Sequence, residues 1–213
     1  RELIEGSIRE LARAKMLRYN FETKSMNPTE TGIVASHFYI RYGSLEVYNE
    51  LVHEAMTEAD CFDVLARSAE FDNVVSREEE NRELMTLLTN SCPIKIKLLA
   101  MEGGGIVIDE RTKVNILLQA YISRAQVDGF ALVADMLHVV QSAGRIFRAL
   151  FELVLKKGWV TVASRLLTLN KTVDKRIWSF QHPLRQFGNG IPAEFLGRLE
   201  ERELTLDRLC DMD

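Results

Sequence analysis

The 213-residue sequence is poor in cysteine and lacks a long uncharged apolar run. Cys61, Cys92 and Cys210 are far apart and form no C-x-x-C pair, which argues against a zinc site or a disulfide-stabilised scaffold. Charged residues interrupt the apolar runs well before the roughly 20 residues that a membrane span requires, and the first residues lack the apolar core of a signal peptide. These features predict reduced thiols, an intracellular location and no membrane partner.

The sequence also lacks a strong excess of charge of either sign. It has 27 Lys and Arg against 31 Asp and Glu, which gives a formal net charge of −4. Overall charge therefore does not indicate nucleic-acid binding, and any such contact must come from a local stripe of cations. An amphipathic pattern is already present at Arg1 and still present at Asp213, so we expect a segment of a longer protein.

Proline and glycine are scarce, with four and twelve residues. Most apolar residues recur at three- and four-residue spacing, which predicts a mainly α fold. Residues 1–29 have the pattern of a helix and two short strands, at 16–20 and 26–29, joined by a polar turn. This order is typical of the C-terminal part of a winged-helix domain.

Residues 30–187 have the pattern of a helical bundle. Its first helices are expected to begin at the N-caps Thr31, Ser44 and Thr57. A capping box formed by Ser76 and Glu79 is expected to begin the fourth helix.

The rest of the bundle is expected to contain a long connection followed by three helices. Residues 90–112 predict a flexible surface loop. Helical patterns follow at 112–124, 130–157 and 159–174. Residues 188–213 then predict two short helices with a tight link, which indicates the start of a helix-hairpin-helix domain.

The sequence contains no complete catalytic motif. No Gly-Lys-Ser/Thr follows Gly103–Gly105, so this triplet does not match a phosphate-binding P-loop. His53-Glu54 begins like a zinc-protease helix, but Thr57 occupies the position of the second histidine. The acidic run Glu78–Glu80 is interpreted as the solvated first turn of a helix. We therefore expect no active site, cofactor or metal within this segment.

Residues 130–157 form the longest uninterrupted helical pattern in the sequence. On a helical wheel, one arc is apolar and contains Leu132, Met136, Val140, Ala143, Phe147, Leu150 and Val154. The opposite arc contains His138, Gln141, Arg145, Arg148 and Glu152. The first four of these can donate hydrogen bonds, and arginine suits phosphate oxygens or base stacking. Because most amphipathic helices simply present their polar side to water, periodicity alone leaves solvation and nucleic-acid binding both open.

Several strings along the chain resemble superfamily 2 DExH helicases that have tandem cassettes. They are Thr29–Ile40, Glu70-Phe71 with Arg77–Glu80, Lys113–Arg124, Gln141–Arg145, and Asp174–Trp178 with Pro183–Phe187. Together they cover essentially the whole chain. The sequences of these strings are most similar to the subgroup of activating signal cointegrator complex helicases and their fungal counterparts in ribosome quality control. They are also more similar to a first cassette than to a second.

The resemblance implies a parent protein that hydrolyses ATP with Mg²⁺ in two RecA-like domains upstream of Arg1 and moves 3′ to 5′ along a strand. The 130–157 helix would then be the central ratchet helix. Its residues His138, Gln141, Arg145 and Arg148 would contact single-stranded RNA or DNA. Its polar stripe has no aromatic side chain before Trp159, which argues for phosphate contacts rather than base stacking.

The resemblance also implies partners and a location for the parent protein. The segment would pack on the upstream RecA-like domains, and the ribosome or other complex subunits are further expected partners. The implied role is the splitting of stalled ribosomes in quality control or the repair of alkylation damage, in the cytoplasm and also the nucleus. The main alternative is a protein-interaction scaffold, and an unrelated helical domain is a third interpretation.

Overall fold

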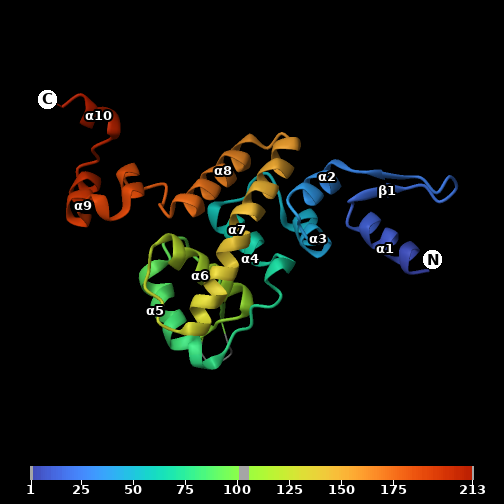
Figure 1. The fold of residues 1–213 in the computed structure, drawn as a ribbon, viewed down its shortest axis with the longest axis horizontal. Helices are drawn as coiled ribbons and strands as arrows, with labels where there is room; N and C mark the ends of the chain where they lie inside the picture. The colour runs from blue at the N-terminus through green and yellow to red at the C-terminus, as the bar shows by residue number, and fades with distance from the viewer. Residues whose placement is uncertain (1, 101–105, 213) are drawn as a thin grey trace.

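A computed structural model describes residues 2–100 and 106–212, and these form a mainly helical fold, as predicted (Figure 1). At the N-terminal end, α1 (Glu2–Arg13) precedes an antiparallel hairpin of β1 (Leu17–Tyr19) and β2 (Met26–Pro28). Leu17 pairs with Pro28 across this hairpin. The predicted helix and two short strands are thus confirmed. They lie at one edge of the molecule, away from the bundle centre.

The bundle begins with α2 (Glu30–His37), two residues earlier than the predicted cap implied. Thr29, and not Thr31, is the N-cap, because its side chain accepts a hydrogen bond of 3.0 Å from the Gly32 amide. A Cβ atom at Gly32 would lie 1.9 Å from the Met16 carbonyl oxygen, so only glycine permits this approach. The helix therefore packs directly on the segment that joins α1 to β1.

The next helices are α3 (Tyr42–Leu51) and α4 (Glu58–Ala66). The cap predicted at Ser44 is wrong, since Ser44 lies inside α3 and its hydroxyl bonds the Glu70 carboxylate instead. The cap at Thr57 is confirmed, with the Asp60 side chain completing a capping box.

The fourth predicted helix is present as α5 (Asn81–Ser91), after the short 3₁₀ helices η1 (Ala69–Phe71) and η2 (Glu78–Glu80). The predicted capping box is wrong. Ser76 instead donates to the Ile108 carbonyl at 2.6 Å, so its hydroxyl joins two segments distant in sequence.

The connection after α5 contains more structure than the predicted loop. β3 (Leu99–Ala100) and β4 (Ile106–Val107) form a short antiparallel pair, and Asp109 caps α6 (Glu110–Ile122). Gly103–Gly105 lie outside the described residues.

The centre of the bundle is the hairpin of α7 (Phe130–Lys156) and α8 (Val160–Lys175), with α6 packed beside it (Figure 1). The predicted long helix is confirmed to within one residue at its C-terminal end. Gly158 has a φ of +77°, which suits the tight turn between the two helices. The core around α7 includes Phe62, Leu65, Ala143, Phe147, Leu150 and Val154.

By length and composition alone, α7 is long and apolar enough to cross a membrane, with a mean hydropathy of 1.2 over its most apolar 18 residues. Core helices pass the same test. Here α7 packs against α6 and α8, which bury its apolar residues, and it also carries Arg145 and Arg148. This is weak support for a membrane span.

The C-terminal part consists of η3 (Pro183–Gly190), α9 (Ala193–Glu201) and α10 (Leu206–Cys210). Gly188, at a φ of +57°, interrupts η3. The two short helices that were expected are present, and Thr205 caps the second. The domain boundaries at residues 29/30 and 187/188 stay predictions.

Candidate nucleic-acid interface

The polar face of α7 is where the sequence places the candidate residues. His138, Gln141 and Arg148 are exposed there, and Arg145 is half-buried. The predicted apolar arc is largely buried, and Val139, Ile146 and Leu153 extend it. Burial is broader than the wheel implied because α7 has packed neighbours on more than one side.

Three of the four candidate residues share one pocket of about 460 Å³ beside α7. The pocket lies between α7, the ends of α2 and α6, and the last turns of α8. Its lining residues are Phe38, Tyr121, Val140, Gln141, Gly144, Arg145, Arg148, Val173 and Asp174. We call this cavity the α7 pocket. Its polar groups come mainly from α7, and Asp174 is the carboxylate among its described lining residues.

Arg145 is committed to holding the chain after α2. Its Nη1 atom donates to the Phe38 carbonyl at 3.0 Å and also to the Tyr39 carbonyl, and Nη2 lies 3.4 Å from the Ser142 hydroxyl. These carbonyls follow the last turn of a helix, where acceptors lack intrahelical partners. Tyr39 has a φ of +53°, an uncommon value for a non-glycine residue. Arg145 thus fixes this turn, and only part of its guanidinium faces the pocket.

Arg148 is held only weakly. Its Nη2 atom is 3.5 Å from the Asp174 carboxylate, with the two side chains 60% and 44% exposed. Exposed ion pairs of this kind contribute about 0–1 kcal/mol. The Arg148 guanidinium can therefore exchange Asp174 for another anion at small cost.

His138 is separate from the other three candidates. Its Nε2 atom is 3.3 Å from the Glu70 carbonyl, and its ring meets Phe71 edge-on at 6.3 Å between centroids. It lies over η1, about one helical turn before Gln141, and it does not line the α7 pocket. The structure therefore brings together Gln141, Arg145 and Arg148 but leaves His138 outside.

A buried charge cluster under α7 was missed by sequence reasoning. Lys113 is fully buried, and its ammonium donates to Glu80 at 2.5 Å, to Asp135 at 2.7 Å and to the Val75 carbonyl at 2.8 Å. Arg77 adds a 2.6 Å ion pair to Glu80. The interpretation of Glu78–Glu80 as a fully solvated turn is therefore wrong for Glu80, which is 8% exposed.

A second feature that sequence reasoning missed adjoins the α7 pocket. The Arg176 guanidinium carbon lies 4.1 Å from the ring centroid of Tyr121, and its Nε donates to the Tyr121 carbonyl at 2.9 Å. Arg176 has a φ of +53°. Nothing in the local pattern signals this contact, because the two residues come from different helices.

The described residues offer little for covalent or metal chemistry. Among them, no group of three His, Cys, Asp or Glu side chains could hold a metal ion. Burial raises the pKa of the Cys61 and Cys92 thiols to about 12, so both stay protonated and unreactive near neutral pH. The arrangement instead suits reversible contact with an anionic partner.

Comparison with known proteins identifies the family. A family model described as the Sec63 Brl domain matches residues 28–205. The chain is 46% identical over 204 residues to human activating signal cointegrator 1 complex subunit 3, covering 96% of this chain and 9% of that protein. It is 43% identical over 213 residues to the DExH-box ATP-dependent RNA helicase DExH14 of Arabidopsis thaliana, covering 100% of this chain and 10% of that protein.

A third relative is the human U5 small nuclear ribonucleoprotein 200 kDa helicase, at 38% identity over 212 residues, 100% of this chain and 10% of that protein. The chain thus spans about a tenth of the length of these relatives. The resemblance inferred from the sequence motifs is confirmed. The chain therefore belongs to the Sec63 Brl domain family, as a module of the kind found in superfamily 2 DExH helicases.

Proposed function

We propose that this segment is the non-catalytic nucleic-acid-guiding module of an ATP-dependent 3′–5′ helicase. The polar face of α7 lies against a single strand of RNA or DNA as the strand leaves the motor. The observation that carries this proposal is the α7 pocket, which places Gln141, Arg145 and Arg148 together beside the longest helix. ATP and Mg²⁺ are bound elsewhere in the parent chain, by the RecA-like domains on which this module packs.

The geometry suggests a division of roles among the three residues. Arg148, exposed and weakly paired, provides the phosphate contact, since a charge-assisted hydrogen bond contributes about 1.5–3 kcal/mol. Gln141 is exposed about two helical turns before Arg148 on the same side. Arg145 acts mainly as a positioning residue, because it holds the turn at Phe38 and Tyr39. A few such contacts can hold a strand and still release it.

The cellular role of the parent protein is a separate part of the proposal. Activating signal cointegrator 1 complex subunit 3, to which this chain is similar, is by its name a subunit of a complex. We propose that it acts with other subunits or the ribosome, either in splitting stalled ribosomes or in the repair of alkylation damage. Its location is then cytoplasmic, with a nuclear pool for repair.

The test uses the full-length protein with Arg148→Glu. We expect single-strand affinity to fall about tenfold at low salt, because one phosphate contact is replaced by repulsion. Unwinding should fall with it, while the melting temperature stays close to that of the unchanged protein. Arg82→Glu, the same charge reversal at an exposed position of α5, is the matched control and should leave binding unchanged.

A scaffold function is the second candidate, and exposed apolar side chains favour it. Phe130 is 89% exposed and Leu137 is 51% exposed on the first half of α7. Such side chains suit a protein partner. Two results together would support the scaffold and contradict strand guiding. The Arg148→Glu protein would unwind its substrate normally, and a Phe130→Ser/Leu137→Ser protein would no longer bind a purified complex subunit.

A further inference from the structure

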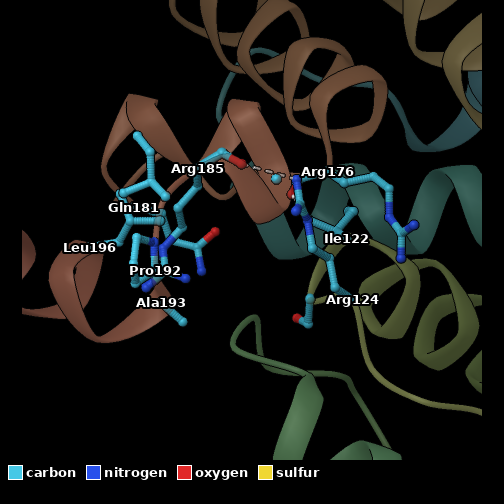
Figure 2. Close-up of a pocket in the computed structure, with 11 residues that line it drawn as sticks. Ile122, Arg124, Arg176, Gln181, Arg185, Pro192, Ala193 and Leu196 are labelled. Atoms are coloured by element: carbon cyan, nitrogen blue, oxygen red, sulfur yellow. Dashed lines mark hydrogen bonds between the residues drawn. The ribbon is translucent and has the colours of Figure 1, made fainter.

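A second cavity, of about 360 Å³, lies where the bundle meets the C-terminal helices (Figure 2). It is bordered by the C-terminal ends of α6 and α8, by η3 and by the start of α9. Its lining residues are Ile122, Ser123, Arg124, Arg176, Gln181, Arg185, Gly188, Ile191, Pro192, Ala193 and Leu196. We call it the junction pocket. A volume in this range is typical of small-ligand sites.

The polar side chains of the junction pocket are dominated by donors. None of the described residues that line it carries a carboxylate. Gln181 uses its Oε1 atom to accept from the Trp178 amide at 3.0 Å, which leaves the Nε2 donors for a ligand. Ser123 is fully engaged, because its hydroxyl donates to Ser91 and accepts from the Trp178 indole.

Arg124 is the cation that remains available in this cavity. Its Nε atom donates to the Arg176 carbonyl at 3.3 Å, and Nη2 donates to the Arg185 carbonyl at 3.2 Å. Nη1 has no acceptor among the described residues. Arg185, in contrast, is neutralised by a two-pronged pair with Glu200, both distances being 2.6 Å. Arg124 with Gln181 therefore forms a donor set suited to an anion.

The junction pocket and the α7 pocket both have the C-terminal end of α6 in their walls. Tyr121 lines the α7 pocket, and the next residue, Ile122, lines the junction pocket. Arg176 lines the junction pocket, and its side chain extends away from the C-terminal helices (Figure 2). Its guanidinium lies over the ring of Tyr121, which lines the α7 pocket. Under the proposed function, a strand that follows the end of α6 from the α7 pocket reaches Arg176 and then Arg124.

We propose that the junction pocket is a second phosphate-binding site, which takes a backbone phosphodiester of the same single strand. This inference rests on the proposed function of the α7 pocket and extends it to the C-terminal helices. Arg124 and Gln181 donate to the phosphate oxygens. Arg176, stacked on Tyr121, provides a cationic surface between the two sites.

The test is Gln181→Glu in the full-length protein. The glutamate keeps an oxygen for the Trp178 amide and places a negative charge in the cavity that Arg124 also lines, which opposes the binding of a phosphate. We expect affinity for a labelled single-stranded oligonucleotide to fall about tenfold at low salt. The slope of log affinity against log salt should lose about 0.7, the value for one phosphate of a single strand. The melting temperature should stay unchanged or rise.

Gln186→Glu is the matched control, since Gln186 is exposed, lies in the same segment and does not line the pocket. It should bind within twofold of the unchanged protein. Arg124 itself is not replaced, because its guanidinium also ties α6 to the C-terminal segment. Arg148→Glu is measured alongside to separate the two proposals.

Each outcome decides one of the proposals. If Gln181→Glu binds the strand normally while Arg148→Glu does not, the junction pocket is not a strand site and the α7 proposal stands. If neither variant loses affinity, the proposed function itself fails. If Gln181→Glu binds free inorganic phosphate more weakly than the unchanged protein but binds the strand equally well, the pocket binds a free anion. That result also overturns the proposal.

Discussion

At the scale of single residues, the two arginines on the polar face of α7 have different tasks. They are three positions apart and were equivalent on the helical wheel. Arg145 bonds two main-chain carbonyls, whereas Arg148 meets one exposed carboxylate at 3.5 Å. Only the folded chain separates them, because the turn at Tyr39 comes from a distant part of the sequence.

This difference predicts different stability effects. Arg145→Ala should lower the free energy of unfolding by about 2 kcal/mol, because the Phe38 and Tyr39 carbonyls lose a charged donor. Arg148→Ala should change it by less than about 0.5 kcal/mol, as for other exposed positions. Urea denaturation of the two variants checks this. Equal losses would show that Arg145 does not hold the α2 turn.

At the scale of elements, α9 is attached to η3 through the Arg185–Glu200 pair. Glu200 also accepts from the His182 amide at 2.8 Å, so one carboxylate serves three donors. Hydrogen bonding from Arg185, and then the His182 amide, lowers the pKa of Glu200 against the opposing effect of burial. The junction pocket depends on this attachment, since Pro192 and Leu196 form one of its walls.

The lowered pKa of Glu200 predicts an acid-sensitive C-terminal part. A carboxylate with a depressed folded-state pKa contributes stability above its unfolded value of about 4.3, and this is lost as pH falls through the folded value. We expect amide protection in α9 to decrease below about pH 4.3. Hydrogen exchange on the unchanged protein and on Glu200→Gln tests this. The variant should show low α9 protection at all pH values, and pH-independent protection in both would contradict the attachment.

Sequence reasoning succeeded for elements whose signal is local. The periodicity of α7 and the N-cap signal at Thr57 were both sufficient. It failed at Thr31, where Thr29 offers the same hydroxyl two residues earlier, and at Ser44, whose hydroxyl bonds Glu70. In the candidate site, the arginines were predictable from the wheel. Asp174 was not, because it belongs to another helix.

At the scale of the whole molecule, a buried charge cluster connects η2, α6 and α7. Lys113 contacts Glu80 and Asp135 in a place that no water-facing pattern marks. The two ion pairs explain how Lys113 can be fully buried in α6. Through Asp135, the cluster fixes the first half of α7 against α6.

We therefore predict that Lys113→Met destabilises the whole bundle. Removing one partner of a buried ion pair costs about 3–5 kcal/mol, because Glu80 and Asp135 lose their compensating charge. Lys97→Met is the matched control: Lys97 pairs with Asp60 at 2.9 Å but is 72% exposed, so its loss should cost about 1 kcal/mol or less. Thermal unfolding distinguishes the two. Similar melting temperatures would mean that the cluster contributes little.

The exposed pair of Arg148 and Asp174 has a consequence for movement along a strand. Asp174 is an anion tethered permanently next to the gripping cation. Under the proposed function, the Arg148 guanidinium pairs again with Asp174 each time a phosphate leaves, so it keeps an anionic partner between two steps. The free-energy barrier between successive phosphate positions is thereby lowered, which favours movement of the strand over a stall.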